Sequence, residues 1–318
     1  MTRRTIISML FHIAGSLFLL SAVILLVGWI IGVIFSDQWT WTQWLSWIPE
    51  LILVPAGLCW LAGISLVQRW RRHWQPAVLM LVLGPALFLF MNWKPSGPTD
   101  IGSPEGITIT QWTLGTILEN EDEFARPLIE INSDISILEG GRRVRWSKPI
   151  KEWLGSDHTP LSTGIFSIFT QLPVDTLRSI IWAEGIYAAK FVVSGPGFET
   201  TPLKILLIDL PSDPNRSRWD IAIRLKELLA KVSMEDVDLI IGDFNMPSNS
   251  AALASLFPGY KDAWAISGNG WGPTFPREWP IARLDHVLVG PTVEVTSIRT
   301  INPGLGRHSL QIIQVAGR

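Results

Sequence analysis

An apolar run stops at a polar turn in the stretch DLIIGDFNMPSNS, residues 238–250. Its first four residues have the pattern of a short buried strand, and Gly242 permits a backbone conformation that most residues avoid. Asp243 and Asn245 follow on the turn, where a carboxylate and an amide face solvent or a ligand. An ordinary Asp/Asn turn would explain the same residues, so the rest of the chain must decide between a turn and a site.

Other acids and a histidine also stand at the ends of apolar segments. Asp285 precedes the run HVLV, and an acid at this place is costly unless it is paired. Asp209 ends the run LKILLID, where it serves a site or caps the next turn. His308 lies near the C-terminus as a surface or site residue. A site requires Asp243, Asn245, Asp285 and His308 to converge at one end of the folded domain.

Alternating strands and helices must position these side chains. The clearest helix is RSRWDIAIRLKELLAKV, residues 216–232, whose apolar residues recur at helical spacing. A shorter helical candidate, residues 122–132, contains Pro127. Many strands with few helices predict a layered α/β or α+β sandwich. The predicted strands are residues 107–114, 134–140, 163–173, 186–193, 203–211, 238–245, 282–290, 295–301 and 309–317.

The order of these segments resembles the endonuclease/exonuclease/phosphatase superfamily, which has the fold of DNase I, abasic-site endonucleases, sphingomyelinases and inositol-phosphate phosphatases. The resemblance covers about residues 107–315 and is most specific in GDFNMPS and WGPTFPREWPIARLDHVLV. It implies an α/β, DNase I-like four-layer sandwich of two packed β-sheets flanked by helices. It also implies hydrolysis of a phosphodiester or phosphate ester assisted by Mg²⁺ or Mn²⁺.

The resemblance also implies roles for individual residues. Asp243 would orient the attacking water, and Asn245 would contact the phosphate. Asp285 matches the acid on a conserved strand of the pattern, and His286 stands where the family has His or Tyr. His308 matches the C-terminal histidine, which supplies proton transfer or a phosphate contact.

The first two strands depart from the family pattern. Thr113 stands where the family has Asn, and it is a weak neutral metal ligand. Glu139 stands at the place of a Gln, and Gly140 at the place of the Glu that is the main metal ligand. Neighbouring side chains on a strand point to opposite faces, so we expect Glu139 to replace that ligand only if a bulge re-aims it. The candidate metal ligands are therefore Glu139, Asp285 and Thr113.

Two later positions also differ. Asp209 replaces a histidine, and Arg307 replaces the Asp that orients the C-terminal histidine. We expect His308 to lose its carboxylate partner and Arg307 to lower its pKa, although an arginine can also bind phosphate. Two interpretations stay open. One is a rebuilt hydrolase whose acids are Asp209, Asp243, Asp285 and Glu139; the other is a catalytically impaired relative that binds or scaffolds at the membrane.

Three apolar runs precede this domain, and Thr5 to Ser36 contains no charged residue. They predict transmembrane helices at about residues 6–35, 48–67 and 76–93. A cleaved signal peptide is disfavoured by the length of the first run and by the two runs behind it. A two-helix arrangement, with one run lying in the interface, is the alternative. Residues 94–106, rich in Pro, Gly and Ser, predict a linker to a domain of residues 107–318.

Charge predicts the orientation. Arginines precede the first run, and Arg69, Arg71 and Arg72 lie between the second and third runs. The positive-inside rule places both segments in the cytoplasm and the domain outside it. The lipid bilayer and a phosphate-ester substrate or ligand are the expected partners.

Composition excludes other classes of protein. From residue 101 onward the chain has 20 Lys and Arg against 25 Asp and Glu, which disfavours a dedicated nucleic-acid-binding surface. Cys59, within the second apolar run, is the only cysteine, so the domain has neither a disulfide nor a cysteine-based zinc site.

Overall fold

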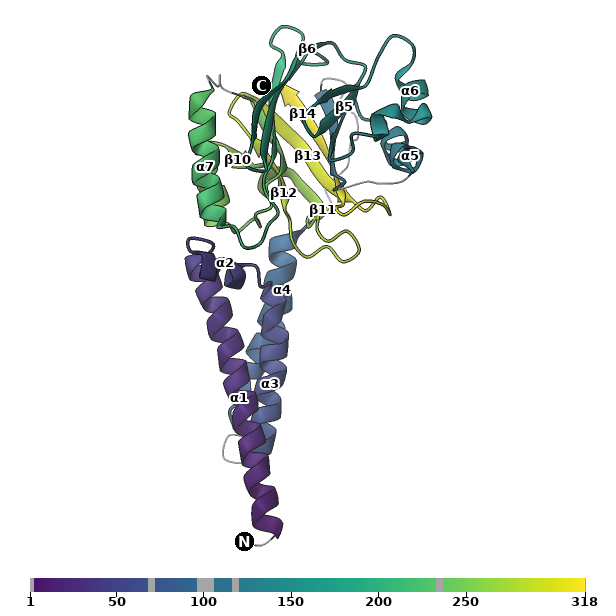
Figure 1. Cartoon of the computed structure of the whole chain (residues 1–318). Helices are drawn as coiled ribbons and strands as arrows, with labels where there is room; N and C mark the ends of the chain where they lie inside the picture. The colour runs from purple at the N-terminus through teal and green to yellow at the C-terminus, as the bar shows by residue number, and fades with distance from the viewer. Residues whose placement is uncertain (1–2, 68–71, 96–105, 116–119, 233–236, 318) are drawn as a thin grey trace. The chain divides into compact units, whose positions relative to one another are not determined.

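The computed structural model describes residues 3–67, 72–95, 106–115, 120–232 and 237–317 (Figure 1). The chain divides into two compact units. The first consists mainly of the N-terminal 92 residues, and the second mainly of the residues from Trp93 onward. The arginines at 69 and 71 and most of the predicted linker, residues 96–105, lie outside the described residues.

The described elements of the first unit are helices, and its three long apolar runs lie within them. Gly15 in the first helix faces Gly63 in the third, where an added Cβ would lie 2.9 Å from the Gly15 carbonyl oxygen. Small residues let helices approach this closely. The elements are α1 (Arg3–Phe35), α2 (Thr40–Ser46), the 3-10 helix η1 (Glu50–Ile52), α3 (Leu53–Leu66) and α4 (Gln75–Asn92).

Two or three helical segments of the first unit could cross a membrane, so the expected count of three stays a prediction. Among the described residues, α1 and α4 are each long and apolar enough, with mean hydropathy of 2.9 and 1.7. The second expected span, residues 48–67, contains η1 and α3, and together with the preceding α2 these form a pair of helical segments bent by 75°. The count is therefore two, or three if the bent pair forms one span.

The second unit contains two β-sheets in its described residues. The strand order is β1-β11-β13-β14-β2-β3-β5-β4 in the larger sheet and β10-β12-β9-β8-β7-β6 in the smaller one. The strands are β1 (Trp93–Lys94), β2 (Gly106–Thr113), β3 (Ile135–Glu139), β4 (Leu161–Thr163), β5 (Phe166–Thr170), β6 (Val174–Ala183), β7 (Ile186–Val193), β8 (Leu203–Asp209), β9 (Leu239–Asp243), β10 (Lys261–Asp262), β11 (Gly268–Trp271), β12 (Asp285–Val289), β13 (Val293–Ile301) and β14 (Leu310–Gly317).

Helices cover the outer faces of the two sheets (Figure 1). On the smaller sheet, α7 buries Ile221, Ala222 and Leu225. On the larger sheet, α5 and α6 pack on an apolar cluster that includes Trp112 and Leu138. The helices are α5 (Glu121–Ile131), η3 (Val144–Trp146), α6 (Lys148–Leu154), α7 (Arg218–Lys231), α8 (Ala251–Leu256) and α9 (Ala263–Ser267). The architecture is thus an α/β sandwich of two sheets flanked by helices.

The main core lies between the sheets. Alternate residues of the central strands fill it, including Ile109 on β2, Ile137 on β3, Leu207 on β8 and Ile241 on β9. Strands β8 and β9 are buried on both faces over most of their length, which is why they read as apolar runs in the sequence.

Local departures from the expected elements have physical causes. The strand predicted at residues 163–173 is a hairpin, because Gly164 adopts a φ of 59° between β4 and β5. Strand β6 was not predicted, because most of its residues are only half-buried or exposed and lack an apolar period. Trp93 and Lys94 form a strand paired with Trp271 and Gly270, rather than a helix end and the start of a linker.

Candidate active site

Apolar inner positions give way to polar ones at a single end of the sandwich. On β9 the inward residues are Leu239 and Ile241, and Asp243 is the next. Strand β12 runs antiparallel to β9, so its first residue, Asp285, lies opposite Asp243. The same alternation ends in polar residues on the other central strands: Thr113 on β2, Glu139 on β3 and Asp209 on β8. The topology therefore gathers residues that are far apart in sequence.

Backbone conformation and hydrogen bonds from Asn245 fix the turn after β9. Gly242 has a φ of 153°, and an added Cβ would lie 1.8 Å from the Ile208 carbonyl oxygen. Asn245 adopts a φ of 50°, and its N–H donates to the Asp243 Oδ1 at 2.9 Å. Its side-chain amide donates to the Leu210 carbonyl at 2.8 Å. The turn thus fixes Asp243 at the inner end of β9, and a phosphate contact by Asn245 stays a prediction.

Asp285 lies at the centre of the hydrogen-bond network of the site. The Thr113 hydroxyl donates to its Oδ1 at 2.6 Å, from the opposite sheet. Its backbone N–H donates to the Thr274 hydroxyl at 3.4 Å. The Asp285 Oδ2 lies 2.7 Å from the His308 Nδ1. Thr113 therefore orients the Asp285 carboxylate. Its role as a metal ligand stays a prediction.

The expectation that His308 lacks a carboxylate partner is wrong. Asp285, the first residue of β12, is that carboxylate partner. The His308 Nε2 lies 3.9 Å from the Asp243 Oδ2, so both ring nitrogens face acids. Burial and Arg307 lower the pKa of His308, but Asp285 and Asp243 outweigh them and raise it to about 9. The partner comes from tertiary packing, which adjacency in sequence does not reveal.

The acids differ in their affinity for protons. Burial alone would raise the pKa of Asp285, but the His308 charge and the hydrogen bonds from His308, Thr113 and Thr274 lower it to about 2. Burial and Asp285 raise the pKa of Asp243 to about 7. Asp285 and His308 thus form an ion pair, while Asp243 is poised to titrate near neutral pH.

The other two acids of the cluster, Asp209 and Glu139, also have raised pKa values. Burial, Asp243 and Asp285 raise the pKa of Asp209 to about 8. Burial and the same acids raise the pKa of Glu139 well above its usual range. The cluster therefore contains more carboxylates than its one histidine can neutralise.

Glu139 points into this cluster from the last position of β3. Its Oε2 accepts a hydrogen bond from the Asp243 N–H at 3.1 Å, and its Oε1 accepts one from the Gln111 Nε2 at 2.9 Å. Glu139 needs no bulge to reach the site, because β2 and β3 pair in regular register with Thr113 beside Glu139. Gly140 follows with a φ of 82° and an added Cβ there would lie 2.5 Å from the Gly115 carbonyl oxygen.

Sequence reasoning missed Gln111 and Thr274. The Gln111 Nε2 also donates to Thr113 and to the Asp285 Oδ1, at 3.0 and 3.2 Å. Gln111 lies two residues before Thr113, so the period of a strand would have placed both on one face. Thr274 lies in the WGPTFP motif that carried the resemblance, but motif matching did not indicate its contact with Asp285. His286 faces the opposite side, where its Nε2 lies 2.8 Å from the Met246 carbonyl oxygen.

A divalent cation fits this donor set. Ligand atoms of Asp243, Asp285 and His308 all lie within 4.8 Å of one another, and all three residues are buried. Burial, followed by repulsion between the acids, raises the pKa values of Glu139, Asp209 and Asp243, so ionising them together requires a counter-charge. Carboxylate oxygens are the ligands that Mg²⁺ prefers, and a cation would lower these pKa values.

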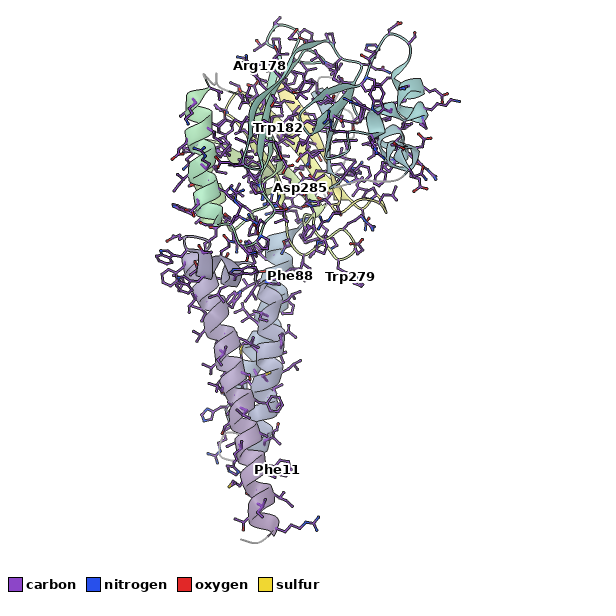
Figure 2. All side chains as sticks on the ribbon, viewed as in Figure 1. Phe11, Phe88, Arg178, Trp182, Trp279 and Asp285 are labelled. Carbon is purple, nitrogen blue, oxygen red and sulfur yellow. The ribbon has the colours of Figure 1, made fainter. Side chains whose placement is uncertain are left out.

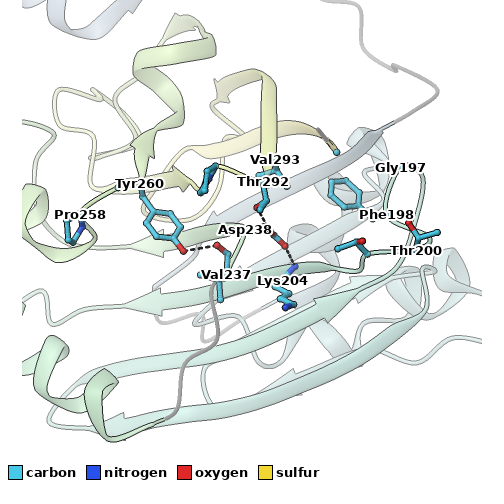
Figure 3. Close-up of a pocket in the computed structure, with 14 residues that line it drawn as sticks. Gly197, Phe198, Thr200, Lys204, Val237, Asp238, Pro258, Tyr260, Thr292 and Val293 are labelled. Atoms are coloured by element: carbon cyan, nitrogen blue, oxygen red, sulfur yellow. Dashed lines mark hydrogen bonds between the residues drawn. The ribbon is translucent and has the colours of Figure 1, made fainter.

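A separate pocket of about 720 Å³ lies at the other end of the sandwich, near the first residues of β8 and β9 (Figure 3). Asp238 accepts a hydrogen bond from the Lys204 N–H at 2.8 Å and another from Thr292. The Tyr260 hydroxyl donates to the Val237 carbonyl at 2.7 Å. These polar groups bond to one another, and the pocket contains none of the predicted site residues.

The fold and site agree with comparisons to known proteins. The sequence model of the Endonuclease/Exonuclease/phosphatase family matches residues 139–309. The chain belongs to this family, which includes phosphatases and nucleases, and its domain has the DNase I-like fold. No curated protein matches the sequence significantly.

Solved structures share the fold at low sequence identity. A mannosyl-6-phosphatase from Bacteroides thetaiotaomicron is 10% identical with a TM-score of 0.52, over 66% of this chain and 99% of that one. A family protein from the same organism is 10% identical with a TM-score of 0.50, over 66% and 97%. A conserved protein of unknown function from Enterococcus faecalis is 14% identical with a TM-score of 0.50, over 67% and 100%. At such identity the likeness shows the fold alone.

Proposed function

We propose that this chain is a membrane-anchored, metal-dependent hydrolase that acts on a phosphodiester or phosphate ester outside the cytoplasm. The observation that carries the proposal is the convergence of Asp243, Asp285 and His308, with Glu139, at one end of the sandwich. Membrane anchoring is supported by the apolar helices α1 and α4. The extracytoplasmic placement rests on the distribution of arginines in the sequence.

Glu139 and Asp285 would hold Mg²⁺ or Mn²⁺ through carboxylate oxygens, beside Asp243. The bound ion would neutralise phosphate charge in the transition state. Thr113 contributes by holding the Asp285 carboxylate in place, since its hydroxyl already donates to that group.

The protein residues supply the proton transfers. A cation beside Asp243 would lower its raised pKa and keep it ionised at neutral pH, so Asp243 accepts a proton from the attacking water. His308, with its Nδ1 bound to Asp285, presents its Nε2–H toward Asp243 and the site. Its pKa of about 9 keeps it protonated at neutral pH, so it donates a hydrogen bond or a proton to a phosphate oxygen. The exposed guanidinium of Arg307, beside His308, is suited to bind phosphate.

One observation favours the alternative, a catalytically impaired relative that binds a ligand or scaffolds at the membrane. The Gln111 amide donates to both Glu139 and Asp285, and so links two acids without a metal. If that amide permanently replaces a cation, the family fold persists without hydrolysis. The two functions make opposite predictions for activity and for metal uptake.

The test is hydrolysis of soluble phosphate esters by the purified full chain in detergent. We expect turnover of bis(p-nitrophenyl) phosphate or p-nitrophenyl phosphate with Mg²⁺ or Mn²⁺, and at least about a 100-fold loss in Asp243→Asn. Asp157→Asn, a change at an exposed acid, is the matched control and should retain activity. Absence of turnover with either metal and both esters would support the impaired relative.

A further inference from the structure

The loop between β11 and β12 carries exposed apolar side chains at its tip. Phe275 and Ala282 close its base through two backbone hydrogen bonds, at 2.9 and 3.0 Å. Beyond that closure, the Trp279 side chain is 81% exposed and that of Ile281 is 45% exposed. Figure 2 shows Trp279 projecting from the body of the domain. Exposing a large aromatic side chain to water is unfavourable, so its exposure indicates a surface that contacts something apolar.

The base of the same loop forms a wall of the acid cluster. The Phe275 ring lies 5.0 Å from the His308 ring, measured between centroids. The Arg277 N–H donates to the Arg307 carbonyl at 3.0 Å, and the Arg277 side chain donates to the Gly306 carbonyl at 2.9 Å. A surface that docks at the loop tip is therefore close to the site where the phosphate must bind.

The loop is also tied to the strand that follows the last apolar helix. Helix α4 ends at Asn92, and Trp93 starts β1 without an intervening residue. Strand β1 pairs with β11 through Trp93 and Trp271, and the Trp271 Nε1 donates to the Pro280 carbonyl at 3.0 Å. Within the second unit, β1 is thus the neighbour of the strand that leads into the loop.

We propose that Trp279 and Ile281 insert into the interfacial layer of the bilayer, and that the site therefore takes a phosphate ester carried by a lipid. This inference rests on the proposed function and adds its substrate class. Tryptophan prefers the membrane–water interface, and arginines favour the anionic headgroup region. The exposed Arg307 supplies such a charge, while Arg277 pairs with Glu278. A soluble ester needs no contact with the loop tip.

The first experiment compares lipid-borne and soluble esters with the full chain reconstituted in phosphatidylcholine vesicles. The lipid substrates are phosphatidic acid, a monoester, and phosphatidylglycerol, a diester; the soluble ones are the nitrophenyl esters. We expect Trp279→Ser with Ile281→Ser to reduce turnover of the lipid ester about tenfold and to leave soluble turnover unchanged. Trp146→Ser, at another exposed tryptophan of the domain, should change neither rate.

Three results of this experiment would overturn the inference while leaving the hydrolase intact. They are hydrolysis of soluble esters without hydrolysis of either lipid, equal loss of both activities in the double variant, and no loss of lipid turnover. If the parent chain hydrolyses nothing, the proposed function fails instead, and the docking surface is decided by a second measurement.

That measurement reports the depth of the loop tip and needs no activity. Cys59 is the only cysteine, so Trp279→Cys in a Cys59→Ser background takes one environment-sensitive fluorophore. We expect lipids with a spin-labelled headgroup region to quench this fluorophore strongly and to spare one attached through Trp146→Cys. Equal quenching at the two positions would refute insertion of the loop.

Discussion

At the scale of single residues, the protonation of the site depends on contacts that cross between the sheets. Asp285 stays ionised because His308, Thr113 and Thr274 stabilise its charge against the cost of burial. Asp243 lacks so complete a set of partners, and its pKa rises to about 7. Two acids side by side in one sheet thus become suited to different tasks, one to holding charge and one to exchanging a proton.

Thr113→Val tests this division of roles. The change removes the hydroxyl bonded to the Asp285 Oδ1 with little change in volume, so the pKa of Asp285 should rise and that of His308 should fall below about 9. An NMR titration of His308 in the metal-free protein measures the shift directly. We expect a loss of about tenfold in ester hydrolysis to accompany it.

Thr108→Val is the matched control, since Thr108 is on the same strand and alternates with the inward-facing Ile107 and Ile109. An unchanged His308 titration in Thr113→Val would show that the hydroxyl does not stabilise the ion pair.

The residues of the site were only partly predictable from the sequence. Asp243 and Asp285 stood out because each ends or begins an apolar strand. The carboxylate partner of His308 did not, because Asp285 is 23 positions away. Nothing in the sequence distinguishes Gln111 from other residues of a core strand. Only the sheet pairing shows that its amide lies beside Glu139. Partners that cross between strands depend on register and packing, which motif spacing does not encode.

At the scale of elements, the site exists because five strands have apolar inward-facing residues along most of their length and polar ones at the same end of the sandwich. The central strands were predictable, β8 and β9 from their apolar runs and β2 from alternation with β-branched residues. The edge strand β6 was not, because exposed edges carry mixed polar sequences. The short helix α2, which precedes the second apolar segment and is bent by 75° from η1–α3, was also not predicted.

Gly242→Ala tests how the end of β9 is positioned. A Cβ at residue 242 would lie 1.8 Å from the backbone oxygen of Ile208, so β8 and β9 must separate at the acids. We expect the free energy of unfolding of the domain to fall by about 3 kcal/mol or more. Hydrogen exchange of the β8 and β9 amides in the full chain measures the loss.

Gly259→Ala provides the control, because Gly259 also has a positive φ, of 96°, but an added Cβ meets nothing within 4 Å. It should lose only the cost of backbone strain, about 1–2 kcal/mol. Equal losses in the two variants would mean that close strand packing does not position Asp243.

At the scale of the whole molecule, an apolar helical unit precedes a family domain with a buried acid cluster. The sequence indicated both units through their composition. The orientation of the chain across a membrane is a separate prediction from its arginines.

Cysteine labelling tests that orientation. In a Cys59→Ser background, a cysteine at Asp157 in the domain should react with a membrane-impermeant maleimide added outside intact spheroplasts. A cysteine at His73, between α3 and α4, should react only after lysis. The reverse pattern would place the domain in the cytoplasm and remove the extracytoplasmic substrate from consideration.

The most direct test of the central claim is anomalous diffraction from crystals of the full chain soaked in Mn²⁺. If the converging acids form a metal-dependent phosphoesterase site, one strong anomalous peak should lie among Glu139, Asp243 and Asp285, and it should vanish in Asp285→Asn. No peak among these carboxylates, in crystals whose surface sites do take up Mn²⁺, would contradict the account.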